Sequence, residues 1–238
     1  MQEAIEIKNE FYSEWVTQEG LGLLEPGKPN DNGILFLVFF QILLDIFGIY
    51  DEKDQAHFVN AHESIYVRPG EYKRRIEDFG TDAHDNMLAI VVGAKLAKKD
   101  YIVEEICDHM DKTGGVSDHT TNSKWKLSQM RQGSEIAFYR IMANRIPFFL
   151  DMFWLCGGLI VNAIKSNYSS KNLGFMRVWA LTRFGYSHLP YLYHASLYLC
   201  VGIWWAIITF KKGVLHNFSN YYVERHPILK LMRMINGL

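Results

Sequence analysis

Two short polar segments, 68–74 and 82–86, bring together side chains that could bind an anion and transfer a proton. The first, RPGEYKR, is a turn that projects Tyr72 and Arg74, and the second, DAHDN, is the start of a helix. An arginine pairs with a carboxylate or an anionic ligand, and a well-placed aspartate acts as a general acid or base. These residue types predict a binding cleft or active site at residues 68–86.

Asp85 is the central candidate for acid or base catalysis, and His84 beside it is a candidate hydrogen-bond partner. Glycoside hydrolysis uses two carboxylates that flank the sugar bond, and Asp31, just before an apolar helix, could supply the second. Asp31, His84 and Asp85 are therefore the expected catalytic residues. The expected ligand-binding residues are Asn32, Tyr72, Arg74 and Asn86.

A purely structural explanation of the same pattern stays open. Asp82, Asp85 and Asn86 stand at i, i+3 and i+4, so they share one face of a helix. Because a helix N-terminus stabilises acids, Asp82 could cap the helix while Asp85 interacts with its dipole. The basic residues of segment 68–75 could likewise be a solvated helix start.

Three motifs in this part of the chain resemble a pattern in uncharacterised helical proteins encoded by bacteriophages. They are DNG at 31–33, PGEYKR at 69–74 and HDNMLAI at 84–90, and together they cover about residues 30–92. The resemblance implies an α/α toroid, similar to six-hairpin glycosidases, with a carbohydrate as substrate or ligand. Asn86 stands where those proteins often carry an acid, which counts against a paired carboxylate at that position.

Composition and charge limit the class of protein. The chain has 238 residues, 49% of them hydrophobic, so it can bury a large core. Its formal net charge of -1 argues against a general nucleic-acid-binding role. Three cysteines without a C-x-x-C pair suit buried thiols in a reducing compartment, and the N-terminal segment lacks the features of a signal peptide. We therefore expect a protein of the host-cell cytoplasm or one associated with a virion.

Cys107, Asp108 and His109, with His119, are the nearest approach to a metal site. Zinc requires three or four convergent nitrogen or sulfur ligands, and Cys107 and His109, two apart on a helix, cannot share a face. The glycine pairs precede no G-K-[ST] phosphate loop, and no serine stands in a G-x-S-x-G context. The sequence predicts neither a metal nor another cofactor.

Helical spacing of apolar residues predicts an all-α chain of antiparallel hairpins, in one domain over residues 1–238, with no alternating strand. An amphipathic helix is expected over 3–18, and a buried apolar helix over 34–50, capped by Asp31 or Asn32. Thr81 or Asp82 is expected to cap a helix that ends near residue 98. Further helices are expected near 53–66, 100–112, 124–130, 134–145, 147–165, 173–184, 189–210 and 227–236.

Residues 146–164 and 189–210 are long and apolar enough to raise the question of a membrane span. The first contains Asp151, and the second has no formal charge. A mean hydropathy of -0.07 favours a central helix of a large core for 189–210, with a membrane segment as the alternative. Its aromatic residues are expected in the core, with a sugar-stacking platform as the alternative. They are Tyr191, Tyr193, Tyr198, Trp204 and Trp205.

The function expected from these observations is hydrolysis or binding of a carbohydrate in a cleft near residues 68–86, and whether the chain is an enzyme stays open. One alternative is a non-catalytic, virion-associated or interaction protein with the same fold. Another is a membrane-associated helical protein that uses residues 189–210. The sequence leaves the oligomeric state open.

Overall fold

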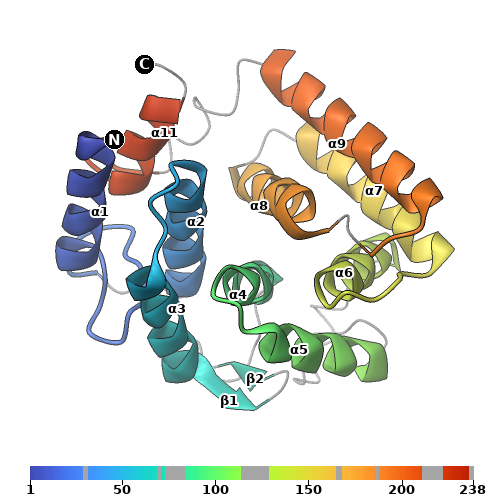
Figure 1. The fold of residues 1–238 in the computed structure, drawn as a ribbon, viewed down its shortest axis with the longest axis horizontal. Helices are drawn as coiled ribbons and strands as arrows, with labels where there is room; N and C mark the ends of the chain where they lie inside the picture. The colour runs from blue at the N-terminus through green and yellow to red at the C-terminus, as the bar shows by residue number, and fades with distance from the viewer. Residues whose placement is uncertain are drawn as a thin grey trace.

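Most of the chain folds into α-helices in the computed structural model (Figure 1). The structure describes residues 1–28, 32–68, 71–72, 84–113, 129–164, 168–185, 188–210 and 222–235. The helices are α1 (Gln2–Glu14), α2 (Gly33–Ile46), α3 (Glu52–Ile65), α4 (His84–Leu96), α5 (Asp100–Thr113), α6 (Gln129–Met142), α7 (Phe149–Ile164), α8 (Tyr168–Phe184), α9 (Tyr191–Phe210) and α11 (Pro227–Ile235). The all-α prediction is confirmed.

Several predicted boundaries are wrong. Helix α1 ends at Glu14 rather than at residue 18, and α2 ends at Ile46 rather than at residue 50. Helix α6 begins at Gln129 and runs through Gly133, whereas the sequence predicted separate helices over 124–130 and 134–145. A Cβ at Gly133 would stand 2.6 Å from the side chain of Trp154, so this glycine serves close packing rather than a helix break. Helix α8 begins at Tyr168, earlier than predicted. The predicted caps Thr81 and Asp82 lie outside the described residues.

A short β-hairpin follows α3, although the sequence predicted no strand. Strands β1 (Tyr66–Arg68) and β2 (Glu71–Tyr72) pair antiparallel, with Tyr66 opposite Tyr72. Strands of three and two residues are too short to show a two-residue periodicity. The Tyr66 hydroxyl donates to the Glu105 carboxylate at 3.0 Å, which ties the hairpin to α5.

The helices form an inner and an outer layer (Figure 1). Helices α2, α4, α6 and α8 contact one another in the interior, and α1, α3, α5 and α7 lie outside them. The composition of α2 explains why it lies in the inner layer, because a helix that is apolar on all sides must be covered on all sides. Every residue from Gly33 to Leu44 is buried.

Two features show how α3 packs against its neighbouring helices. A Cβ at Gly93 of α4 would lie 2.3 Å from a ring carbon of Phe58 in α3, so only glycine permits this approach. On the polar side of α3, the Lys8 ammonium contacts the Asp54 carboxylate at 2.7 Å and the Asp51 carboxylate at 2.8 Å. Asp51 and Asp54 also form a capping box at the start of α3.

Helix α9 lies on the outer side of α7, away from the inner layer (Figure 1). This placement corrects the expectation of a fully buried central helix over 189–210. Trp204 is buried and Tyr193 is half-buried, but Tyr191, Tyr198 and Trp205 are exposed. Among the described residues, we find no helix that combines the length and apolar character needed to cross a bilayer.

The C-terminal helix is fastened to the N-terminal part of the chain through His226. Its Nε2 lies 2.9 Å from the Leu23 carbonyl oxygen, and its Nδ1 accepts from the Ile228 backbone N–H at 3.1 Å. The ring is completely buried and lies against Trp15 and Tyr222. Because burial disfavours the charged imidazolium, the pKa of His226 falls to about 4.

Replacing His226 with Gln should make the stability of the fold less dependent on pH. The unfolded chain takes up a proton on this histidine near pH 6.5 and the folded chain only near pH 4. The histidine therefore favours the folded state above pH 6.5, and this contribution is lost as pH falls toward 4, by an amount on the order of 3 kcal/mol. Urea unfolding gives the free energy of unfolding at each pH. Its dependence on pH between 4 and 6.5 should be weaker for His226→Gln than for the wild-type chain. Equal slopes for both proteins would contradict the assignment.

Candidate functional site

The predicted polar cluster is only partly within the described residues. Asp31 and Arg74 lie outside them, so the separation of Asp31 and Asp85 stays untested. Tyr72 ends β2 and His84 begins α4, but their side-chain positions are not described. The cleft near residues 68–86 therefore stays a prediction.

Asp85, Asn86 and Asn32 have described surroundings. Asp85 is half-buried in the first turn of α4, and the neighbouring Asn86 is buried. Asn32 occupies the N-cap of α2, but within the described part of the chain its side chain makes no capping hydrogen bond. Its backbone angles, φ -97° and ψ 22°, are outside the extended region from which a side chain caps. The prediction of the N-cap position is confirmed, and the prediction of side-chain capping is wrong.

Among the described residues, Cys107 and His109 belong to no metal-binding cluster, and His119 lies outside the described residues. Cys107 and His109 are both buried on α5, and burial raises the pKa of the Cys107 thiol to about 11. Across the described ranges, we find no group of three histidine, cysteine or acidic side chains that could hold a metal ion. Their burial makes both side chains part of the core around α5.

A buried ion pair between the inner helices was missed by sequence reasoning. The Glu135 carboxylate of α6 accepts from the Arg177 guanidinium of α8, and both residues are buried. The two positions are 42 residues apart, and no local pattern links them. A charge pair inside a helical core fixes how two helices meet, because either charge alone would be uncompensated.

The feature that most distinguishes the molecule is a large apolar surface over α7 and α9, which we call the α7–α9 face. Its members are large hydrophobic side chains that are between 44% and 87% exposed. They are Ile146, Phe148, Phe149, Leu150, Phe153, Ile164, Tyr191, Leu192, Tyr198, Leu199 and Trp205. Asp151 is the sole Asp, Glu, Lys or Arg in the sequences of the two helices.

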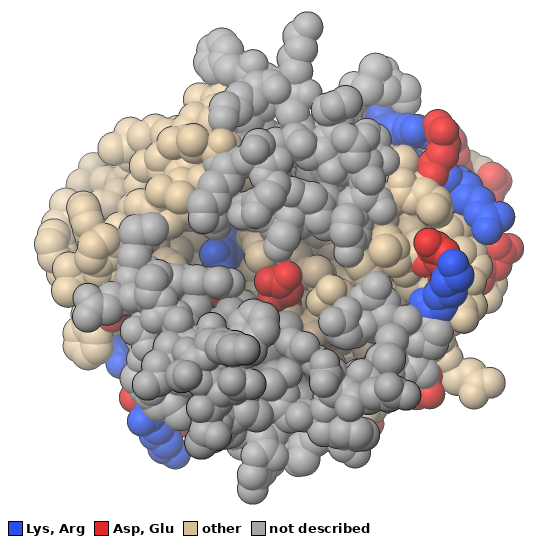
Figure 2. Space-filling model, turned by 180° about the vertical axis from the view of Figure 1, so that it is seen from behind, with Lys and Arg blue, Asp and Glu red and all other residues tan. Residues whose placement is uncertain are grey.

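The α7–α9 face stands out from the rest of the surface. Figure 2 shows α7 and α9 toward the upper left as a broad area without charged side chains, whereas both charges alternate on the opposite side, around α1. At about 150–200 Å² for a fully exposed large side chain, the face presents roughly 1,000–1,400 Å² of apolar surface. The largest apolar patch on a typical monomer is about 300–600 Å². The α7–α9 face is therefore the strongest candidate for an interaction surface.

The exposed positions of α9 repeat every seven residues. Tyr191, Tyr198 and Trp205 form one row, and Leu192, Leu199 and Ala206 form a second. The small residues Ala195 and Gly202 lie between the rows and are also exposed. A seven-residue apolar repeat is the pattern by which one helix packs along another.

Gly202 adds a separate indication of a partner. A Cβ at this position would meet no described atom within 4 Å, in contrast to Gly93. A glycine inside a helix costs about 1 kcal/mol relative to alanine. The internal packing of the chain does not explain this glycine, whereas close approach of another backbone would.

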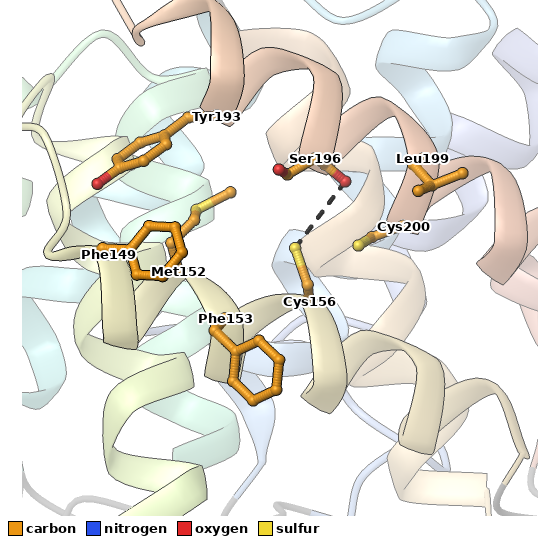
Figure 3. Close-up of a pocket in the computed structure, with 8 residues that line it drawn as sticks. All are labelled: Phe149, Met152, Phe153, Cys156, Tyr193, Ser196, Leu199 and Cys200. Carbon is orange, nitrogen blue, oxygen red and sulfur yellow. Dashed lines mark hydrogen bonds between the residues drawn. The ribbon is translucent and has the colours of Figure 1, made fainter.

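A pocket of about 210 Å³ opens between the two helices within this face (Figure 3). Its lining residues are Phe149, Met152, Phe153 and Cys156 of α7, and Tyr193, Ser196, Leu199 and Cys200 of α9. The helices run in the same direction, because Phe149 lies near Tyr193 and, seven residues further along each helix, Cys156 lies near Cys200. The Cys156 thiol donates to the Ser196 carbonyl oxygen at 3.9 Å.

Comparison with known proteins gives no independent indication of function: no family model, no curated protein and no solved structure matches the chain. The α7–α9 face and its pocket are therefore interpreted from their own geometry. The sequence did contain a sign of this face, the seven-residue apolar repeat in 191–206. The same repeat occurs in helices whose apolar side is buried, so the sequence could not show that this side is exposed.

Replacing Arg177 with Met should destabilise the fold by about 3–5 kcal/mol, because the Glu135 carboxylate would stay buried without its partner. Adding Glu135→Leu should recover most of the lost free energy of unfolding, since the uncompensated charge is then removed. The matched control is Arg233→Met, because Arg233 forms an exposed pair with Glu224 and should cost less than about 1 kcal/mol. Urea unfolding measures all three. Equal losses for Arg177→Met and Arg233→Met would refute the structural role of the buried pair.

Proposed function

We propose that the chain is an interaction protein that assembles with a second copy of itself through the α7–α9 face. The observation that carries this proposal is the size of the face, roughly 1,000–1,400 Å² of exposed apolar side chains. A stable interface needs about 800 Å² from each partner. One face per subunit is therefore large enough for a dimer.

The composition of the face favours a protein partner over a lipid surface. Helices that lie on membranes carry lysine and arginine along their polar side, where they meet anionic headgroups. The sequences of α7 and α9 contain neither residue type, and Asp151 adds a negative charge. The seven-residue repeat of α9 fits a helical partner, because lipid imposes no such period.

The exposed side of α9 can pair with the same side of α9 in a second copy. This α9 stripe consists of positions 191, 192, 195, 198, 199, 202, 205 and 206. In an antiparallel pairing about a two-fold axis between positions 198 and 199, Tyr191 of one copy faces Ala206 of the other and Leu192 faces Trp205. Ala195 then faces Gly202, where the backbones approach most closely, and Tyr198 faces Leu199. Each of the eight exposed stripe positions meets another, as a two-fold interface requires.

The carbohydrate hypothesis stays a second proposal, limited to the resemblance of segments 31–33, 69–74 and 84–90. The two layers of helices are compatible with the α/α toroid that the resemblance implies. Its candidate acids are Asp31 and Asp85, with Asp85 half-buried at the start of an inner helix. A virion-associated role would agree with assembly through the α7–α9 face.

Sedimentation equilibrium tests the assembly. At about 10 μM the wild-type chain should be dimeric, because interfaces of this size give micromolar or tighter dissociation constants. Leu199→Lys should be monomeric, since it places two ammonium groups near the two-fold axis. The control is Tyr101→Lys, because Tyr101 of α5 is 62% exposed and Leu199 is 65% exposed. This control should stay dimeric.

Gly202→Leu separates assembly from folding. It should raise the free energy of unfolding of the single chain by up to about 1 kcal/mol, because leucine is the better helix former. It should also weaken the dimer, because its side chain would occupy the space of Ala195 in the second copy. A monomeric wild-type chain that floats with neutral phosphatidylcholine vesicles would overturn the proposal and indicate a membrane surface. A dimer unaffected by Leu199→Lys would place the interface elsewhere.

A further inference from the structure

The two cysteines of the pocket meet across the contact between α7 and α9. Cys156 and Cys200 are at equivalent places on the two parallel helices, and their thiols lie next to each other in the pocket (Figure 3). Both are free thiols, with Cys200 buried and Cys156 half-buried. The third cysteine, Cys107, is buried on α5 and does not line the pocket.

We propose that Cys156 and Cys200 are a dithiol site, which small-molecule disulfides of the glutathione type oxidise to a reversible disulfide between α7 and α9. The observation behind this proposal is that two neighbouring thiols, one from each helix, line a pocket that opens to solvent. It does not depend on self-assembly, because both cysteines belong to one chain.

Thiol–disulfide exchange proceeds in two steps. The Cys200 thiolate attacks one sulfur of the disulfide reagent, which breaks the S–S bond of the reagent and releases one equivalent of its thiol. The Cys156 thiolate then attacks Cys200 in the mixed disulfide and releases the second equivalent. The protein loses two protons and two electrons, and the reagent, now two thiols, gains them.

The surroundings of the two thiols differ in a way that suits these roles. Interaction with the neighbouring Cys156 thiol lowers the pKa of the Cys200 thiol, so Cys200 more readily becomes the attacking thiolate. Interaction with Cys200 and burial raise the pKa of Cys156, so this thiol keeps its proton until Cys200 has reacted.

The new bond would join the two helices that carry the α7–α9 face. Helix α9 contacts the rest of the described chain mainly through α7. A covalent link at this contact would hold α9 in place against α7 and keep the face in one arrangement. Oxidation therefore acts on the same surface that we propose for assembly.

Intact-mass analysis of dilute protein, treated with oxidised glutathione and then alkylated after denaturation, tests the site. The wild-type chain should lose two hydrogens and take up a single alkyl group, at Cys107. Peptide mapping should find Cys156 linked to Cys200, and dithiothreitol should reverse the change. Cys107→Ser, the matched control, should form the same disulfide with no remaining alkylation.

The single variants separate the two roles. Cys156→Ser should hold one glutathione at Cys200, because no second thiol is present to displace it. Cys200→Ser should react at least tenfold more slowly, because the thiolate that attacks first is missing. A wild-type chain that takes up three alkyl groups, or that carries stable glutathione on Cys156 or Cys200, would overturn the proposal. Dilution below the dimer dissociation constant keeps this result independent of self-assembly.

Discussion

The structure depends on one constraint: a helix that is apolar on every side must be covered on every side. Helix α2 meets this constraint within the chain, since its residues from Gly33 to Leu44 are all buried. Helix α9 is also almost free of charge, but it packs against α7 at the edge of the molecule. One side of α9 is therefore buried and the other exposed. The proposed second copy supplies the missing cover.

Burial of the exposed face would release a large free energy. Transfer of 1,000 Å² or more of apolar surface from water is worth on the order of 25 kcal/mol before the costs of association are subtracted. The remaining surface has a different character, because ion pairs such as Lys230 with Glu10 and Arg145 with Asp108 lie along it. The chain carries charge on its other helices, whereas Asp151 is the one Asp, Glu, Lys or Arg in the sequences of α7 and α9, so the two kinds of surface differ in charge.

Much of the fold could be predicted from the sequence, because helix type depends on local patterns. The run after Gly33 has the composition of a buried helix, and apolar spacing over 53–66 predicted α3. The β-hairpin could not be predicted, since its strands are shorter than the period that would reveal them. The separation predicted between helices 124–130 and 134–145 was wrong, and the close contact of Gly133 with Trp154 is tertiary, so no local pattern shows it.

The candidate sites were less predictable than the fold. The polar cluster around Asp85 was prominent because its members are adjacent in sequence, and part of it lies outside the described residues. Glu135 and Arg177 are 42 positions apart, and Cys156 and Cys200 likewise belong to different helices. Only the packing of α6 with α8, and of α7 with α9, brings each pair together. Sequence patterns show what a helix buries but not which helix covers it.

Hydroxyl-radical footprinting at two protein concentrations tests most directly whether a second copy covers the α7–α9 face. The account predicts that Tyr198 and Trp205 are oxidised more slowly at high protein concentration than at low concentration. Tyr101, which is 62% exposed on α5, provides the internal reference and should be oxidised equally fast at both. Concentration-independent oxidation of all three residues would contradict the account.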